Sequence, residues 1–372
     1  MSRPVRETDD VVTCFRDGEV ILRSERRTEG FTMSDKEIGY QGINEGDIVI
    51  HGMDGFAGAM GISKSTGKGS PVLIVCNPKG FDDSKYIIYY LRSLAITNVF
   101  LALATGIRER SCDLRWNKIS VLPFIRPQSN TQQKIADYLD KVCGEVDEMV
   151  TLQETMIEEL KAYKQSVITE AVTKGLNPNV PMRNSGIDWI GEIPGHWSVC
   201  RIKDLANLQS GTNLTSNDIA DAGDYPVYGG NGLRGYYSKY LIEGDFILIG
   251  RQGALCGNIN YASGKFWPTE HAVVCYPKRS FELKWLGELL RAMNLGQYSL
   301  SSAQPGLAVE RIKNLKMPYP SEKEQRAIAS YLDLKCSEID SLIALKLAKI
   351  EELKEYKKSV IYEYVTGKKE VV

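Results

Sequence analysis

The chain has 372 residues, of which 46 are Lys or Arg and 47 are Asp or Glu, and its net charge is −1. A chain of this length forms about two domains, and its 43% hydrophobic residues are enough to build buried cores. The near-neutral charge excludes proteins that hold nucleic acid mainly by bulk positive charge, so any nucleic-acid site must be local.

No stretch reaches the ~18 to 20 uninterrupted apolar residues of a membrane span, and the opening residues MSRPVRETDD lack the apolar core of a signal peptide. These observations predict a cytoplasmic protein. The eight cysteines never fall two to four residues apart, so they do not have the spacing of structural zinc ligands. We expect reduced, mostly buried thiols and no metal site.

The predicted elements alternate between two α+β domains and two long helices. In chain order we expect a first domain that is short at its start, a long helix, a linker with a second domain, and a second long helix, at 1–126, 127–176, 177–316 and 317–372. Apolar runs bounded by Gly, Pro or Asp predict strands at 48–50, 72–75, 246–249 and 272–274, and helices suit 86–94 and 283–294. Loops are expected at 225–240 and 301–306, and a linker at 175–195.

Each long helix shows a heptad pattern and has start and stop signals. In the first, apolar residues recur every three and four positions, at Ile135, Leu139, Val142, Val146, Met149, Met156, Leu160, Tyr163 and Val167. Ser321 with Glu324 forms a capping box for the second helix, and Asn130 marks the start of the first. We expect the helices to end near Gly175 and Gly367.

The chain is an internal duplication. Residues 132–173 recur at 325–366 with a constant offset of 193, and about half of the positions are identical. The regions in front of these copies are related more weakly, through Glu45-Gly46-Asp47 with Glu243-Gly244-Asp245, and through Gly52 and Gly55 with Gly250 and Gly253. This variable-constant-variable-constant layout suggests one structural task performed twice and one recognition task performed with two specificities.

Two arrangements of the long helices are open. They can pack on each other as an antiparallel coiled coil, which would relate the two variable domains by an approximate two-fold axis and make the helix pair a ruler. Alternatively, each helix is an independent coiled-coil dimerisation arm. We favour the first, because two nearly identical arms in one chain most simply pack together.

The sequence lacks several catalytic motifs. An amino-group methyltransferase needs Asn or Asp followed by Pro-Pro and an aromatic residue, and the nearest string, Met317 to Pro320, has the wrong composition. The stretch Gly61 to Gly69 has one spacer residue too many for a phosphate loop, so we expect an ordinary loop there. His51 and His271 have no paired nucleophile in motif spacing. Catalysis by this chain alone is not expected.

The loops instead carry residues that can read base edges. In the major groove, Arg recognises guanine, Asn or Gln recognises adenine, and acidic residues recognise cytosine. Arg251 and Gln252 lie between two glycines that let the backbone come close to a surface. The full set of candidate DNA-binding residues is Arg16, Arg23, Arg26, Arg27, His51, Arg108, Arg110, Asn231, Arg234, Tyr236, Tyr237, Arg251, Gln252, His271 and Gln304. A solvated surface charge remains the alternative for any single Arg.

Several short strings form a recognisable combination: Asp188-Trp189-Ile190-Gly191-Glu192-Ile193-Pro194 with His196-Trp197, Tyr228-Gly229-Gly230-Asn231-Gly232, Gly250-Arg251-Gln252-Gly253, Glu270-His271-Ala272, Gln304-Pro305-Gly306, and the run from Pro320 through Glu324-Gln325 to Tyr331-Leu332-Asp333. With these strings, the whole chain resembles the specificity subunit of type I restriction-modification systems. Two departures stand out. The first domain begins without the Trp-Ile-Gly-Glu-Ile-Pro opening, and Gln128 to Gln132 replaces the Glu-Gln start of the second long helix.

The resemblance implies a non-catalytic subunit with two target-recognition domains, each reading one half of an asymmetric, split DNA sequence. It further implies two methyltransferase subunits, which bind S-adenosylmethionine, and two restriction subunits that use ATP and Mg. Two other classes remain as alternatives. One is a coiled-coil adaptor without DNA readout, and the other is a standalone nuclease or methyltransferase, which the missing motifs disfavour.

Overall fold

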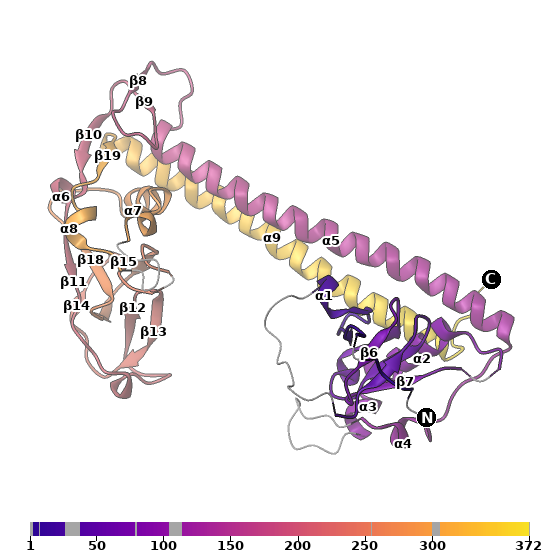
Figure 1. Cartoon of the computed structure of the whole chain (residues 1–372). Coiled ribbons are helices and arrows are strands. Elements are labelled where there is room, and N and C mark those ends of the chain that lie inside the picture. Colours follow the sequence, from indigo (N-terminus) through magenta and orange to yellow (C-terminus); the bar gives the residue numbers. More distant parts are fainter. Residues whose placement is uncertain are drawn as a thin grey trace. The chain divides into compact units, whose positions relative to one another are not determined.

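The computed structural model describes residues 3–6, 8–26, 38–78, 80–103, 114–253, 255–299 and 306–371. Contacts divide the chain into two compact units. The first unit contains residues 1–154 and 346–372, and the second contains residues 155–345. Both units draw on the same two long helices, α5 (Ser129–Lys174) and α9 (Glu322–Val365), which are labelled in Figure 1. Each unit therefore combines a sheet-containing part with one stretch of each long helix.

The two long helices are confirmed, and their starts differ in detail. At α9 the capping box forms as predicted, because the Ser321 N–H and hydroxyl both donate to Glu324 Oε2, at 3.2 and 2.8 Å. The predicted start of α5 at Asn130 was wrong, since the helix already begins at Ser129, whose hydroxyl donates to the Phe81 carbonyl. A buried glutamine, Gln132, anchors this end instead.

The first unit has a three-stranded sheet of order β5-β4-β7, with helix α2 packed against it. Its strands are β1 (Val12–Cys14), β2 (Val20–Leu22), β3 (Gln41–Ile43), β4 (Ile48–His51), β5 (Met60–Ile62), β6 (Gly67–Gly69) and β7 (Leu73–Cys76). Its shorter helices are α1 (Arg23–Arg26), α2 (Ser84–Ile96), α3 (Val99–Leu103) and α4 (Trp116–Ile119). The expected loop from Gly61 to Gly69 was wrong, because β5 and β6 occupy its two ends.

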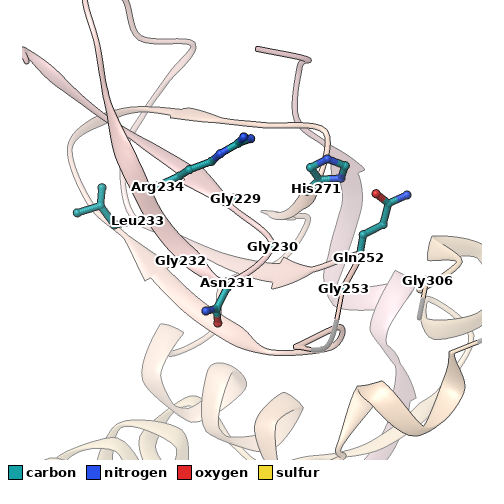
Figure 2. Close-up of a pocket in the computed structure, with 10 residues that line it drawn as sticks. All are labelled: Gly229, Gly230, Asn231, Gly232, Leu233, Arg234, Gln252, Gly253, His271 and Gly306. Carbon is teal, nitrogen blue, oxygen red and sulfur yellow. The ribbon is translucent and has the colours of Figure 1, made fainter. Parts of the chain in front are cut away.

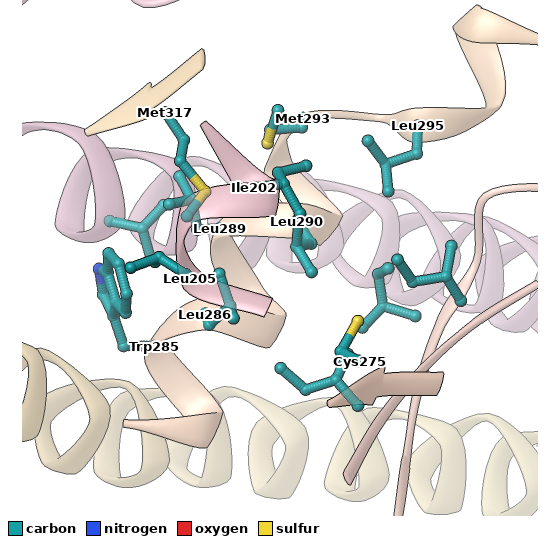
Figure 3. Packing of buried hydrophobic residues seen from close by; sticks show 14 of the residues in the cluster. Ile202, Leu205, Cys275, Trp285, Leu286, Leu289, Leu290, Met293, Leu295 and Met317 are labelled. Carbon is teal, nitrogen blue, oxygen red and sulfur yellow. The ribbon is translucent and has the colours of Figure 1, made fainter. Parts of the chain in front are cut away.

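The second unit has two four-stranded sheets, of order β11-β18-β15-β16 and β13-β12-β17-β14. Its strands are β8 (Met182–Asn184), β9 (Glu192–Pro194), β10 (Ser198–Arg201), β11 (Ala206–Ser210), β12 (Tyr225–Gly229), β13 (Gly232–Tyr237), β14 (Ile242–Glu243), β15 (Phe246–Gly250), β16 (Ile259–Ala262), β17 (Lys265–Pro268), β18 (Ala272–Pro277) and β19 (Lys316–Tyr319). Its shorter helices are α6 (Ile202–Leu205), α7 (Leu283–Ala292) and α8 (Val309–Ile312). Trp285, Leu289 and Met317 lie in the apolar core between α7 and these strands (Figure 3).

The strand registers correct the alignment of the two copies. Gly52 N–H donates to the Val72 carbonyl, and Arg251 N–H donates to the His271 carbonyl, each at 2.8 Å. Both bonds continue the equivalent pairings of β4 with β7 and of β15 with β18. Gly52 therefore corresponds to Arg251, and the sequence alignment of Gly52 with Gly250 was wrong by one residue.

Two predicted irregular segments contain regular structure. The expected loop at 225–240 is the hairpin β12–β13, closed by a two-residue turn after Gly229, which faces Gly232. Its rings pack edge to face, Tyr228 on Phe266 and Tyr237 on Trp267, which stabilises the strands. The expected linker at 175–195 includes β8 and β9, and Ile193 within it is fully buried.

The heptad stripe of α5 is only partly buried. Ile135, Leu139 and Val146 are buried as predicted, whereas Met149 and Tyr163 are more than half exposed. An ideal α-helix drifts by about 20° per heptad relative to a strict seven-residue repeat, so a straight helix rotates such a stripe off the contact face.

No helix in the described part of the chain is long and apolar enough to cross a membrane.

Candidate nucleic-acid interface

A hollow of about 580 Å³ opens on the second unit. Its lining residues are Gly229, Gly230, Asn231, Gly232, Leu233, Arg234, Gln252, Gly253, His271 and Gly306. In Figure 2 the Arg234 side chain extends toward His271, while Leu233 points away. Four of the candidate DNA-binding residues, which are distant in sequence, therefore surround one hollow.

Tight backbone packing brings the hairpin turn against the end of β15. A Cβ atom on Gly250 would lie 2.0 Å from the Gly230 carbonyl oxygen, so only glycine fits there. Gly253 has a φ of 87°, a left-handed conformation that side chains disfavour. The two glycines thus place Gln252 next to the turn that carries Asn231.

The polar side chains around the hollow are held in place and still accessible. Arg234 Nη2 donates to Ser216 Oγ at 2.9 Å, which leaves most of its five N–H donors for other partners. Asn231 Oδ1 accepts from Asn258 Nδ2 at 3.2 Å. Asn231, Arg234 and Gln252 are all exposed. Hydrogen bonds therefore orient Arg234 and Asn231, and the side chains of Asn231, Arg234 and Gln252 remain accessible to a ligand.

Buried polar atoms near the hollow remain unsatisfied within the described part of the chain. His271 Nε2 lies 3.0 Å from Glu270 Oε1, and Glu270 Oε2 has no partner there. The same holds for Thr269 Oγ1 and Asn260 Nδ2, which lie beside Gly229 and Gly232. Because a buried polar atom without a partner is costly, these positions favour a polar ligand or water in the hollow. Sequence reasoning missed Thr269 and Asn260, since neither lies in a recognisable motif.

Three predicted residues of this unit do not line the hollow. Arg251 Nη1 donates to Ser210 Oγ at 3.2 Å, a contact inside the unit. The backbone of Tyr236 pairs with Ala220, and the ring of Tyr237 packs on Trp267. Arg251 thus makes a hydrogen bond inside its own unit and does not line the hollow with Gln252.

In the first unit, Arg16 and His51 meet at one carboxylate. Arg16 donates to Asp54 Oδ1 through Nε and Nη2, at 3.1 and 2.7 Å. His51 Nδ1 accepts the Asp54 N–H at 3.0 Å, so that nitrogen carries no proton and the other ring nitrogen is the donor. Burial lowers the pKa of His51, which agrees with a neutral ring. The cluster presents a neutral imidazole beside a paired arginine.

The other arginines of the first unit also have partners inside it. Arg26 pairs with Asp17 and Glu19 and stacks over the Phe15 ring. Its hydrogen bond to Asp17 lowers the pKa of that carboxyl. Arg23 Nε donates to Thr13 Oγ1 at 3.2 Å. The remaining candidates, Arg27, Arg108, Arg110 and Gln304, lie outside the described residues.

Comparisons with known proteins identify the class. The family model "Type I restriction modification DNA specificity domain" matches residues 194–355. The specificity subunit of the type I restriction enzyme EcoprrI from Escherichia coli is 42% identical over 134 residues, which are 35% of this chain and 33% of that protein. The MjaVIII specificity subunit from Methanocaldococcus jannaschii is 24% identical over 358 residues, covering 88% of this chain and 80% of that protein.

Solved structures agree at the level of the fold. A chain from a structural study of complex assembly and conformational transition in a type I R-M system superposes with a TM-score of 0.70 at 16% identity, covering 87% of this chain and 83% of that one. The HsdS subunit from Thermoanaerobacter tengcongensis gives a TM-score of 0.53 at 17% identity, covering 88% and 82%.

The fold and the matched domain define a DNA-specificity protein with mixed sheets and long helices. Residues 194–355 match the DNA specificity domain of type I restriction-modification systems, and the similar proteins are type I restriction enzyme specificity subunits, which confirms the resemblance found in the sequence. Both of these relatives are named as specificity subunits, which are the non-catalytic subunits of such systems. The match to the EcoprrI subunit spans about a third of that protein's length.

Proposed function

We propose that this chain reads a bipartite, asymmetric DNA sequence, one half with each unit, as part of a type I restriction-modification complex. Two target-recognition domains joined by an antiparallel coiled coil would present the two half-sites with a fixed spacing. The observation that carries the proposal is the gathering of Asn231, Arg234, Gln252 and His271 around one hollow. Arg, Asn and Gln are among the side chains that discriminate base edges in the major groove.

The two units offer different donors and acceptors for this task. The second unit presents two amides, a guanidinium and an imidazole. The first presents the His51 imidazole beside Arg16, with glycine at position 52 where the second has Arg251. Since base recognition depends on which donor or acceptor faces each base pair, these units should read different half-sites.

Repeated exposed apolar residues support two copies of one protein partner. Met149 and Leu152 of α5 and Tyr356 of α9 belong to the first unit and are about half exposed. At the 193-residue offset of the repeat, these positions correspond to Leu342, Leu345 and Tyr163 of the second unit. These three side chains are likewise about half exposed or more. Exposed apolar side chains in equivalent places suit a partner that binds twice. We assign this role to two methyltransferase subunits and, through them, two restriction subunits.

The cofactors would be on those partners. S-adenosylmethionine would serve the methyltransferase subunits, and ATP and Mg the restriction subunits. This chain would contribute base contacts, while the partners supply part of the phosphate contacts, which fits its net charge of −1.

The test is an exchange of the second variable region. The chain is co-expressed with its methyltransferase partner, and the methylome is sequenced for a bipartite adenine-methylated motif. Replacing residues 188–316 by the same region of a homologue should change one half of the motif only. A change in both halves, or no bipartite motif at all, would contradict the proposal.

A further inference from the structure

A hollow of about 510 Å³ in the first unit is lined by cations from its sheet-containing part and from α9. Among the described residues, the cations in its lining are Arg16, Arg92, Lys354, Lys357 and Lys358. The carboxylates in the lining are Asp17 and Asp147. The lining therefore carries more positive than negative charge.

Both carboxylates already have a cationic partner. Asp17 accepts a hydrogen bond from Arg26 Nη2 at 2.5 Å, and Asp147 accepts one from Lys357 Nζ at 2.6 Å. Because Asp17 and Asp147 are paired in this way, the other cations of the lining remain to attract an anion.

The two outer lysines of α9 are held only by exposed ion pairs. Lys354 pairs with Glu351 at 3.0 Å, and Lys358 pairs with Glu355 at 2.6 Å, each three residues earlier on the helix. Exposed ion pairs of this kind contribute little to stability, so an anion can replace the glutamates as partner of these lysines.

Arg92 is anchored in the lining by backbone carbonyls. Its Nη2 donates to the carbonyls of Asp17 and Met60, at 3.3 Å each. A Cβ atom on Gly18 would lie 1.7 Å from this nitrogen, so only glycine leaves room for the guanidinium there. Within the described part of the chain no carboxylate forms an ion pair with Arg92. The guanidinium is thus fixed in position while its charge remains uncompensated.

The second unit repeats the anchor of this arginine. Arg92 and Met60 correspond to Arg291 and Ile259, each 199 residues later. The Arg291 Nη2 donates to the Ile259 carbonyl at 3.0 Å, as Arg92 does to Met60. The two arginines therefore occupy equivalent places in the two units.

Only the second unit neutralises its arginine. Arg291 Nη1 donates to both carboxylate oxygens of Glu288, at 2.7 Å each, and Glu288 is buried. The residue equivalent to Glu288 is Tyr89, whose ring centre lies 5.9 Å from the guanidinium carbon of Arg92. The carboxylate of one unit is thus an aromatic ring in the other, and the arginine keeps its charge.

The long helices differ in the same sense. At the 193-residue offset, Lys354 and Lys357 correspond to Lys161 and Lys164, whereas Lys358 corresponds to Gln165. The first unit therefore has one more cation on its helix at the place where Arg92 remains uncompensated.

We propose that this hollow holds a backbone phosphate of duplex DNA, so that α9 contacts the DNA in the first unit. The inference rests on the proposed function, because it concerns the same ligand. Arg16 lies in the lining and also meets His51 at Asp54, so a duplex read by that cluster passes the hollow. Arginine and lysine are the usual partners of phosphate oxygens. The contact is specific to the first unit, since the second neutralises Arg291.

The salt dependence of DNA binding tests the site. Lys358→Gln introduces the residue that the second unit has at this place, so it should fold normally. The full-length chain is titrated with a cognate and a random-sequence duplex at 50 and 200 mM salt. One phosphate contact contributes about 0.9 to the salt slope, so this rise in salt should weaken the variant about 3.5 times less than the wild type on both duplexes.

Lys349→Gln is the control, because Lys349 is exposed on α9 in an ion pair of the same spacing and is absent from the lining. It should leave the slope unchanged. An unchanged slope in Lys358→Gln, or an equal change in both variants, would overturn the inference while leaving the proposed function in place. A slope change in Lys358→Gln alone, without preference for the cognate duplex, would support the phosphate contact and contradict the proposed function.

The two arginines provide a second comparison. Arg92→Gln should reduce the salt slope by a similar amount. Arg291→Gln leaves the buried Glu288 carboxylate without its partner, so it should lower the melting temperature and leave the slope unchanged. Equal slope changes in the two variants would overturn the assignment to the first unit.

Inorganic phosphate distinguishes the DNA backbone from a small phosphate compound. The chain is titrated with sodium phosphate in a calorimeter at constant ionic strength, and we expect no binding that Lys358→Gln removes. Phosphate binding that this variant abolishes, together with an unchanged salt slope on duplex DNA, would overturn the proposal and assign the hollow to a small phosphate ligand.

Discussion

Lys164 Nζ lies 2.7 Å from Asp340 Oδ2 in the second unit, and the 193-residue repeat turns this pair into Lys357 and Asp147 of the first unit, at 2.6 Å. Each pair joins α5 to α9. The duplication has therefore preserved a contact between the helices as well as their sequences. Since the lysine in one pair comes from α5 and in the other from α9, the two helices exchange roles between the units.

Reversing the charge of one residue in such an ion pair should destabilise the protein, and reversing the charge of its partner as well should restore the stability. Lys164→Glu places two carboxylates together and should lower the free energy of unfolding by about 0.2 to 1 kcal/mol, the usual range for an exposed pair. Adding Asp340→Lys should restore it. A double-mutant cycle followed by urea unfolding measures the coupling. The equivalent cycle at Lys357 and Asp147 is the matched control, and zero coupling in both would show that the pairs are incidental.

The buried glutamines at the helix starts should be more sensitive. Gln325 Nε2 donates to the Pro320 carbonyl, and its Oε1 accepts the Glu282 N–H. Gln325→Ala leaves the Pro320 carbonyl and the Glu282 N–H without their partner, and it should lower the free energy of unfolding by about 1 to 3 kcal/mol.

Gln132 makes the same two bonds in the first unit, with Pro127 and Asp83, so Gln132→Ala should lose a similar amount. Exposed Gln165 is the control, and its change to alanine should cost almost nothing. Similar losses at all three positions in urea unfolding would contradict this account.

Acid should loosen the attachment of Trp197 to α9. Burial by itself would raise the pKa of Glu324, but hydrogen bonds from Trp197, His196 and Ser321 outweigh it and lower this pKa from 4.5 to about 2. A depressed carboxyl pKa stabilises the fold fully above pH 4.5, and the contribution is lost as the pH falls toward 2. Stability measured across this window should therefore drop, with a parallel change in tryptophan fluorescence. Glu324→Gln should flatten that drop, whereas Glu322→Gln, at an exposed pair with Arg326, should not.

Arg234 is the best single test of base reading. If its free N–H donors bind a base edge, Arg234→Ala should cost about 1 to 3 kcal/mol at one base-pair position and relax the preference there. Titrations on the cognate duplex and on singly substituted duplexes at two salt concentrations measure this. Arg326→Ala, at an exposed position on α9, is the control. Uniform weakening on every duplex, with a salt slope smaller by about one, would indicate a phosphate contact instead.

The spacing between half-sites should follow the length of the long helices. Deleting residues 150–156 and 343–349 removes one heptad from each at equivalent positions of the repeat. Seven helical residues correspond to about 10 Å, or about three base pairs at ~3.4 Å per step. The methylome should keep both half-site sequences and lose about three base pairs between them. An unchanged gap would rule out the ruler.

Local and repeated features were accessible from the sequence. The Ser321–Glu324 capping box, the apolar strands and the two long helices depend on neighbouring residues or on a period, so their patterns predicted them. The hairpin at 225–237 was missed because its Gly, Asn and Tyr residues are typical of loops, and only the packing of its rings on Phe266 and Trp267 makes strands of it.

The sequence alone determined the duplication, the resemblance to type I specificity subunits and the residue types available for reading bases. The tertiary structure decided which of those residues meet: it gathered Asn231, Arg234, Gln252 and His271 around one hollow, and it engaged Arg251 and Arg26 in contacts inside their own units. The reason is physical, because strand pairing, ion pairs and burial join residues that are far apart in the chain, and no local pattern records which partner each side chain finds.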